Sequence, residues 1–340
     1  MRTVVLNNPS QLELTTTPEP PAPGPDEALV RVLRVGVCGT DLHAYLGNQP
    51  MMVYPVILGH ELAVEVLALG SAAGALGVKP GDLCTVIPYL NCQACGACQR
   101  GRINACERLS VLGVHQDGGL RERFVVPARL LLAANDLSLD QLALVEMLAI
   151  GEHAAARAAL EPADTVAVIG AGPIGLSTIA AARQRTDAIV GIDLSESRLA
   201  FLRSTGMAAG LPAGDDTADA LRAHFGGELP TVVIDATGNA ASMQAAAALV
   251  APGGRLVFVG HTKHDLTFAN PLIHRRELSI LASRNATATD FEHVLAALRS
   301  GAVDVAPWIN ARVDPAGFVR ELPRWAAGPS EVVKAVVEFA

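Results

Sequence analysis

The sequence predicts an α/β protein of two domains, in which a β-rich domain is followed by a doubly wound parallel sheet. Its 340 residues exceed the roughly 250–300 at which a single core stops growing, so two domains are expected. In the first half, short β-branched runs are interrupted by glycine and proline, which favours a barrel-like domain. After Gly151, apolar strands alternate with alanine-rich helices, as in a parallel sheet covered by helices.

Turn signals and apolar runs define the expected elements. Residues 1–14 form an alternating strand segment with turn residues at 7–9, and a proline-rich turn occupies 18–25. Strands are expected at 28–37, 56–69, 83–86, 165–169, 188–192, 231–235, 255–259 and 278–282. Helices are expected at 154–160 and 174–184 and from residues 197, 242 and 290. The last strand-like segment, 332–339, is expected to return to the first domain because it has no partner in the second series.

The composition argues against several classes of partner. Thirty-four acidic residues outnumber 26 basic ones, which gives a net charge of −8, and the lysines are Lys79, Lys263 and Lys334. Nucleic acid is therefore not an expected partner. No uncharged apolar run reaches the ~18 residues of a transmembrane span, and no basic region with a long apolar run opens the chain. Reduced cysteines without an export signal suit the cytoplasm.

Four cysteines form a compact C-x2-C-x2-C-x7-C cluster within a lobe at about 91–107: Cys92, Cys95, Cys98 and Cys106. Thiolates at this spacing suit a tetrahedral zinc ion, and the small intervening residues let the backbone turn all four sulfurs inward. The alternatives are two disulfides or four unrelated core thiols. Because four sulfurs leave no open coordination position, we expect this zinc to be structural.

A glycine motif directly follows the strand expected at 165–169 and opens a helix. Its sequence is Gly170-Ala171-Gly172-Pro173-Ile174-Gly175, a G-x-G-x-x-G pattern. Gly170 permits a tight turn, Gly172 lets the backbone approach a pyrophosphate, and Gly175 lets the helix pack closely on the strand. The helix N-terminus then faces the phosphates. The alternative is a glycine turn that binds no ligand.

Asp193 ends the next expected strand, 18 residues after Gly175. A carboxylate there accepts hydrogen bonds from the hydroxyls of the adenosine ribose, which selects NAD. The 2′-phosphate of NADP would be repelled by Asp193, although Arg198 lies nearby in the sequence. We therefore expect NAD rather than NADP.

Further groups suited to metal binding lie outside the cysteine cluster. They occur in Val35-Gly36-Val37-Cys38-Gly39-Thr40-Asp41-Leu42-His43 and in Leu58-Gly59-His60-Glu61. With the cysteine cluster and the glycine motif, in this order, these segments resemble the zinc-dependent medium-chain alcohol dehydrogenase family over essentially the whole chain. The resemblance implies a GroES-like catalytic domain at 1–150, an NAD-binding Rossmann domain at 151–285, and a C-terminal segment at 286–340 that returns to the catalytic domain.

The resemblance also implies a catalytic zinc site. Cys38 and His60 match two zinc ligands, and Glu146 matches the acidic third ligand of the polyol and sugar-acid branch. In similar enzymes the residue at Glu61 either approaches the zinc or exchanges with its water, so the roles of Glu61 and Glu146 stay open. Zinc here would lower the pKa of a substrate hydroxyl so that hydride leaves for NAD.

Three neighbours of Cys38 match supporting roles in this family. Asp41 resembles the carboxylate that orients the ligand histidine. Thr40 resembles the hydroxyl that relays the released proton, and His43 resembles a later, solvent-facing member of the relay. The alternatives are that Thr40 caps a helix and that His43 is a surface residue. Cys84 matches no metal position and is expected in the core.

The substrate is only partly indicated. Glu146 in place of cysteine points to polyols, sugars or sugar acids, and residues 112–119 resemble a segment of bacterial sugar and sugar-acid dehydrogenases, although they could equally be a structural loop. Arg284 is a candidate substrate contact, since a guanidinium binds a carboxylate or several hydroxyls; alternatively it pairs with a surface acid. An aromatic content of 4% argues weakly against a large aromatic-lined pocket.

These observations predict an NAD-dependent zinc enzyme that oxidises a secondary hydroxyl of a polyol, sugar or sugar acid, with one catalytic and one structural zinc per chain. A homodimer or homotetramer is implied by the resemblance, and a small-molecule substrate is the expected partner. One alternative is a dehydrogenase of simple alcohols or threonine-like amino-alcohols. Another is a non-catalytic nucleotide-binding relative, which loss of Cys38 or His60 would mark; both residues are present.

Overall fold

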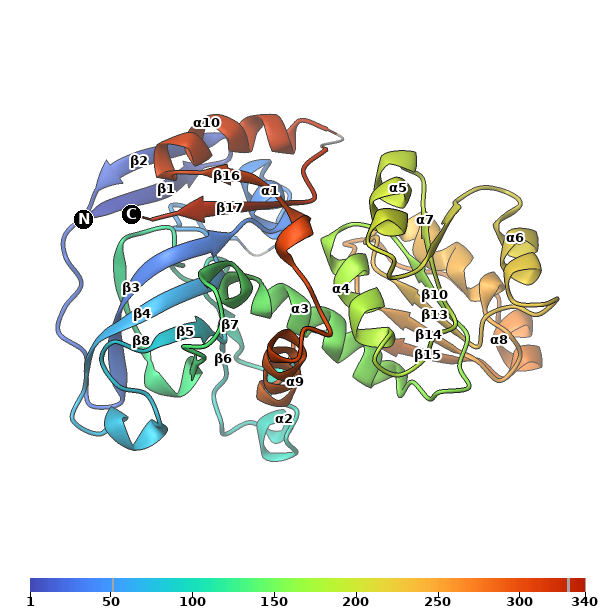
Figure 1. The fold of residues 1–340 in the computed structure, drawn as a ribbon, viewed down its shortest axis with the longest axis horizontal. Helices are drawn as coiled ribbons and strands as arrows, with labels where there is room; N and C mark the ends of the chain where they lie inside the picture. The colour runs from blue at the N-terminus through green and yellow to red at the C-terminus, as the bar shows by residue number, and fades with distance from the viewer. Residues whose placement is uncertain (51, 329–330, 340) are drawn as a thin grey trace. The chain divides into compact units, whose positions relative to one another are not determined.

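The computed structural model describes residues 1–50, 52–328 and 331–339, and Figure 1 shows its fold. The chain forms two compact units. Unit 1 comprises Met1–Glu146 and Leu295–Ala340, and unit 2 comprises Met147–Val294. The boundaries expected from the sequence were 150/151 and 285/286, which lie four residues after and nine residues before the observed ones. Among the described residues, no helix has the length and apolar character needed to cross a membrane.

Unit 1 is built around a mixed sheet with the strand order β16-β17-β3-β4-β5-β9, in which β8 also pairs with β3. β3 (Glu27–Gly36) and β4 (Glu61–Leu69) are its longest strands and pair antiparallel. The C-terminal strand β17 (Lys334–Glu338) pairs with β3 in this sheet. Its other strands are β5 (Leu83–Val86), β8 (Arg123–Pro127), β9 (Leu131–Ala133) and β16 (Ile309–Val313).

Smaller elements complete unit 1. They are the paired strands β1 (Arg2–Asn8) and β2 (Gln11–Thr16), the paired strands β6 (Tyr89–Leu90) and β7 (Ser110–Val111), the helices α1 (Gly39–Tyr45), α2 (Gly96–Gln99) and α10 (Pro315–Ala326), and the 3-10 turns η1 (Ala73–Leu76), η2 (Ile103–Ala105), η3 (Ala128–Leu130) and η5 (Ala306–Trp308). The strand expected at 56–69 begins only at Glu61, because Gly59 adopts a left-handed φ of 94° that interrupts the extended backbone.

Unit 2 is a parallel sheet with helices on both faces (Figure 1). The strand order is β12-β11-β10-β13-β14-β15, so the order reverses between β10 and β13. The strands are β10 (Val166–Ile169), β11 (Ile189–Asp193), β12 (Ala209–Pro212), β13 (Val232–Asp235), β14 (Arg255–Phe258) and β15 (Ser279–Ala282). The connecting helices are α4 (Pro173–Ala182), α5 (Glu196–Ser204), α6 (Thr217–His224), α7 (Ala240–Ala245) with η4 (Ala246–Leu249), and α8 (Asn270–Arg276).

The core of unit 2 explains which strands the sequence predicts. Leu221 of α6 and Met243 of α7 are buried together with Val190 and Val233 of the sheet. β10, β11 and β13 are buried along their whole length, so they appear in the sequence as continuous apolar runs. β12 lies at the sheet edge, is at most half-buried, and was not predicted.

Two helices join the units in sequence, α3 (Leu139–Ala158) and α9 (Ala288–Arg299). The sequence placed a change of structure at Gly151 and a helix only from 154, and this was wrong, since α3 runs unbroken through Gly151. A Cβ at Gly151 would lie 2.5 Å from Ser177 Oγ on α4, so the glycine permits close contact between two helices. A glycine occupies position 151 because the two helices pack closely there, and not because a helix begins or ends at that residue.

Candidate active site

The four-cysteine cluster has the geometry of a metal site. Three of its sulfur pairs are separated by 3.4 Å (Cys92 and Cys106), 3.9 Å (Cys95 and Cys106) and 4.0 Å (Cys92 and Cys98). A tetrahedron with zinc–sulfur bonds of ~2.3 Å has edges of ~3.8 Å, whereas a disulfide needs ~2.05 Å. The cysteines form no disulfides. The donor set and its spacing therefore fit a tetrahedral zinc ion.

Backbone amides prepare this cluster for a cation. The N–H of Cys95 donates to Cys92 Sγ, and the N–H of Cys92 donates to Cys106 Sγ; both N···S distances are 3.3 Å. The amides of Ala94 and Cys95 lower the pKa of Cys92 to about 5, which favours its thiolate. These donors lie in the turn that leads into α2, with Cys95 at its N-cap, so the backbone is already folded around the sulfurs.

Replacing Cys95 by serine is expected to remove about one zinc per chain and to lower the melting temperature, because a structural zinc contributes directly to folding free energy. Elemental analysis and thermal unfolding measure the two effects. Cys84→Ser is the matched control, since Cys84 is buried in β5 away from any candidate ligand, and its zinc content should not change. A Cys95→Ser protein with full zinc content and unchanged stability would contradict the structural role of the cluster.

A second cluster in unit 1 brings together Cys38, His60 and Glu61, whose ligand atoms all lie within 4.8 Å of one another. Cys38 precedes the first turn of α1, where Asp41 Oδ2 accepts a 2.9 Å hydrogen bond from its N–H. His60 and Glu61 stand where the left-handed turn at Gly59 leads into β4, and they are 5% and 1% exposed. The turn before α1 and the turn before β4 thus bring the side chains of Cys38, His60 and Glu61 together.

Glu61 is held by a partner from the other end of the chain. Lys334 of β17 contacts both carboxylate oxygens of Glu61, with a distance of 2.6 Å between Nζ and Oε1, and also donates to Val37 O at 3.0 Å. Both side chains are almost fully buried. Gly36 leaves the room that this carboxylate fills, because a Cβ at that position would overlap Glu61 Oε2.

Glu146 lies on α3 and is 4% exposed. The hydroxyl of Tyr89, in β6, donates to its Oε1. Glu146 is not among the atoms grouped within 4.8 Å around Cys38, although its charge acts on His60. The described contacts of Glu146 include no hydrogen bond to Oε2, so this oxygen is available as a donor for a metal.

The charges around His60 indicate that this cluster needs a cation. Burial alone lowers the pKa of His60, but the nearby Cys38, Asp41 and Glu146 raise it well above its usual range. Burial also raises the pKa of Glu146 and of Asp41. His60 Nδ1 and Asp41 Oδ1 are buried without a hydrogen-bond partner. Three buried carboxyl groups and a thiol outnumber the two basic groups, Lys334 and His60, and a divalent metal would offset that imbalance.

The structure places the remaining predicted members of this half-site on α1. Asp41 is buried and its described hydrogen bond goes to the Cys38 amide, whereas no hydrogen bond to His60 is present. Thr40 is half-buried beside Cys38, and His43 is exposed in the last turn of α1. Thr40 does not cap the helix, since residue 38 occupies the cap position.

The glycine motif forms a turn between β10 and α4 in unit 2. Gly170 has a φ of 96°, and a Cβ at Gly175 would overlap Gly170 O, so both positions require glycine. Gly172 caps α4, with Pro173 and Ile174 in its first turn. The free N–H groups at this helix end suit a pyrophosphate.

Asp193 lies at the carboxyl end of β11 beside this turn. Its Oδ2 accepts from the Ala171 N–H at 2.7 Å and its Oδ1 from the Ser195 N–H at 2.8 Å, which fixes the carboxylate against the glycine turn. Arg198 Nη1 is 3.7 Å from Asp193 Oδ2. Leu194, the next residue, is 88% exposed and offers an apolar surface next to this carboxylate.

Two segments predicted to concern the substrate, Arg284 and residues 112–119, are described by the structure, and the role of Arg284 stays a prediction. Arg284 is exposed in the segment that follows β15 in unit 2. In the 112–119 segment, Gly118 and Gly119 donate their N–H groups to Ile57 O and Gly59 O at 2.7 and 2.8 Å. A Cβ at Gly113 would lie 2.8 Å from Gly59 N. This segment therefore supports the backbone just before His60, which favours the structural interpretation.

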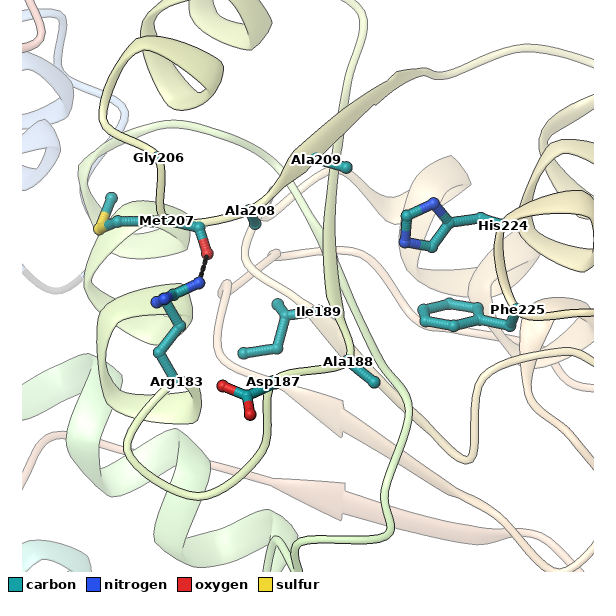
Figure 2. Close-up of a pocket in the computed structure, with 10 residues that line it drawn as sticks. All are labelled: Arg183, Asp187, Ala188, Ile189, Gly206, Met207, Ala208, Ala209, His224 and Phe225. Carbon is teal, nitrogen blue, oxygen red and sulfur yellow. Dashed lines mark hydrogen bonds between the residues drawn. The ribbon is translucent and has the colours of Figure 1, made fainter.

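A hollow of about 480 Å³ lies in unit 2 at the amino ends of the strands, opposite the edge that carries the glycine turn and Asp193 (Figure 2). Ile189 and Ala209, which begin β11 and β12, contribute to its lining, together with Arg183 and His224. Arg183 donates to Met207 O at 2.6 Å across it. Ligands of open α/β sheets bind at the carboxyl ends of the strands, so this hollow is not the nucleotide site.

Comparison with known proteins identifies the family. Residues 24–136 match the alcohol dehydrogenase GroES-like domain, and residues 173–300 match the zinc-binding dehydrogenase model. An L-galactonate-5-dehydrogenase of Escherichia coli K12 is 40% identical over 100% of this chain and 99% of its own. The chain belongs to the zinc-type alcohol dehydrogenase family. The prediction of an α/β dehydrogenase with GroES-like and Rossmann parts is thereby confirmed for this zinc-type alcohol dehydrogenase.

Two other proteins are similar to this zinc-type alcohol dehydrogenase. A sorbitol dehydrogenase of Bacillus subtilis is 32% identical, with coverage of 82% of this chain and 81% of its own. An alcohol dehydrogenase of E. coli CFT073, solved in complex with NADH, superimposes with a TM-score of 0.90 at 28% identity and covers 100% of this chain and 99% of its own. The expected classes of cofactor, zinc and a nicotinamide dinucleotide, agree with this family.

Three residues that surround the metal cluster of this zinc-type alcohol dehydrogenase were not predicted from the sequence, namely Lys334, Tyr89 and Gly36. Lys334 is the one basic residue in the largely apolar segment 332–339, and a cation among apolar residues is a signal of a buried ion pair. Tyr89 and Gly36 carry no comparable signal, because their role depends on contacts across the fold.

Proposed function

We propose that this chain oxidises a secondary hydroxyl of a polyol, sugar or sugar acid and passes hydride to NAD. The observation that carries the proposal is the buried cluster of Cys38, His60 and Glu61 with Glu146 beside it, whose acidic groups suit a divalent metal. Similarity to an L-galactonate-5-dehydrogenase and a sorbitol dehydrogenase supports the substrate class.

Each residue has a proposed role in this reaction. Cys38, His60 and Glu146 hold the metal, while Lys334 neutralises Glu61. Bound zinc would supply the Lewis acidity that lowers the pKa of the substrate hydroxyl. The hydroxyl of Thr40 relays the released proton, accepting it as it gives up its own, and His43, exposed on the same helix, passes a proton to solvent.

The nucleotide half has its own proposed roles. The turn Gly170–Gly175 binds the pyrophosphate, and Asp193 accepts hydrogen bonds from the ribose hydroxyls. Each Asp193 oxygen already accepts one backbone N–H, which fixes the position of the carboxylate. Arg198 lies 3.7 Å from that carboxylate. The positive charge of Arg198 is therefore partly compensated by Asp193 and is less available for the 2′-phosphate of NADP. This supports NAD over NADP.

The expected result is reduction of NAD, and weaker reduction of NADP at equal concentration, with six-carbon alditols or aldonates as substrates. Prior treatment with a chelator should abolish turnover, and added zinc should restore it. Threonine and 2-butanol test the alternative of simple or amino-alcohols. Turnover of those two alone would contradict the proposed substrate class, and no chelator-sensitive turnover on any alcohol would favour the non-catalytic alternative.

Two further expectations belong to the same proposal. The four thiols of the structural cluster must stay reduced to bind zinc, which supports a cytoplasmic location. A homodimer or homotetramer is implied by family likeness alone, and the mass in solution by light scattering tests it.

A further inference from the structure

A basic loop follows the carboxyl end of β14 in unit 2. It comprises residues 261–265, in which His261, Lys263 and His264 are exposed. The whole chain has a net charge of −8 and holds its lysines at three positions. A lysine flanked by two histidines is thus a local departure from the acidic balance of the protein.

Backbone contacts tie the basic loop to the nucleotide edge of the sheet. A Cβ at Gly238, after β13, would lie 3.0 Å from His261 O. A Cβ at Gly170, in the glycine turn after β10, would lie 3.2 Å from Thr237 Cγ2. Along the carboxyl edge of the sheet, the segment after β10 therefore contacts the segment after β13, which in turn contacts the segment after β14.

The strand order indicates which half of the dinucleotide meets the basic loop. β11 lies on one side of β10, whereas β13 and β14 lie on the other. Asp193 follows β11, so the adenosine half extends to that side, and the nicotinamide half extends toward β13 and β14. Hydride passes directly between the nicotinamide and the substrate, so the substrate has to lie on the side of the basic loop.

The charges of the basic loop are available to a ligand. In the ranges 1–50, 52–328 and 331–339, no carboxylate forms an ion pair with His261, Lys263 or His264. Asp265 is the acid of the loop itself and is exposed at its end.

The cofactor does not account for these cations. Its pyrophosphate is expected at the N-terminus of α4, on the turn between β10 and α4. An anion met by the basic loop therefore belongs to the substrate. One full positive charge from Lys263, with imidazole N–H donors beside it, matches the single charge of a carboxylate better than the double charge of a phosphate.

We propose that the basic loop, through Lys263 with His261 and His264, binds the carboxylate of the substrate, so that the enzyme prefers a sugar acid to a neutral polyol. This inference rests on the proposed function, because it presupposes hydride transfer to a bound nicotinamide. It assigns substrate selection to residues outside the metal cluster.

The test compares Lys263→Gln with the wild-type enzyme on galactonate and gluconate, each paired with its neutral alditol, galactitol or glucitol. Removing Lys263 is expected to raise KM for the acid about tenfold, the size of one partly exposed charged contact, with KM for the alditol and for NAD changed less than about twofold. Calorimetric titration of galactonate into the enzyme with NADH should show the same loss of affinity. Lys79→Gln removes an equal charge from the turn before β5 and should change nothing.

Several outcomes would overturn the inference. An unchanged KM for the acids in Lys263→Gln is one, and a KM for NAD that rises equally with every substrate is another, since it would make the loop a cofactor contact. A larger effect on galactitol 1-phosphate than on galactonate would assign the loop to phosphate. Turnover of alditols without binding of acids would overturn the inference and leave the proposed function standing, whereas no chelator-sensitive turnover on any alcohol would remove both.

Discussion

Replacing Glu146 by alanine is expected to remove about one zinc per chain and to lower kcat/KM by more than about 100-fold. That exceeds the roughly 10–100-fold loss typical when a residue beside a metal ligand is changed. Glu146 is buried, and its Oε1 accepts a hydrogen bond from Tyr89, whereas both oxygens of Glu61 contact Lys334. Glu61 Oε2 also lacks a hydrogen bond, so the difference lies in charge: Lys334 compensates Glu61, whereas no ion pair among the described residues compensates Glu146. Elemental analysis and NAD reduction measure the two effects.

Matched variants separate ligand from neighbour. Tyr89→Phe should keep most of the zinc and lose about 10–100-fold in kcat/KM, because it removes only the hydrogen bond that orients Glu146. Glu61→Gln should keep the zinc. If Glu61→Gln loses the metal while Glu146→Ala retains it, then the proximity of Glu61 to Cys38 and His60 decides ligation, and Lys334 does not hold Glu61 away.

The parts of the site that are local in sequence could be predicted from the sequence. The glycine turn is encoded within six consecutive residues. Gly170 has a left-handed φ, and a side chain at Gly175 would overlap Gly170 O, as the motif implies. The cysteine cluster is likewise encoded within fifteen positions, and its sulfurs lie at the spacing of a tetrahedron. Short-range motifs of this kind depend little on the rest of the fold.

The parts that depend on distant contacts could not be predicted. Lys334 and Glu61 are 273 residues apart and meet only because β17 pairs with β3, the strand beside β4. Gly151 was predicted to mark a change of structure, yet it lies within α3. A glycine is needed there because Ser177 approaches the helix too closely for a side chain. A glycine that ends a helix and one that lets another helix come close have the same sequence signal, and only the packing distinguishes them.

Replacing Lys334 by methionine is expected to lower the free energy of unfolding by about 3–5 kcal/mol, the usual cost of leaving one charge of a buried pair uncompensated. Glu61 is 1% exposed and Lys334 is 2% exposed, so water cannot take the place of the lost partner. Urea unfolding at fixed zinc concentration measures the change. Lys79→Met, at an exposed position, should stay within about 0.5 kcal/mol of the wild type.

The double variant Lys334→Met with Glu61→Gln distinguishes the pair from simple packing. If the cost comes from an unpaired buried carboxylate, neutralising Glu61 should recover most of the lost stability, since removing both charges of a buried pair is often close to neutral. If the cost comes from the lost hydrogen bond to Val37 O, stability should stay low in the double variant, because that carbonyl is still without its donor. Recovery of stability without recovery of kcat/KM would show that the charge pair, although dispensable for folding, sets the electrostatics of the metal cluster.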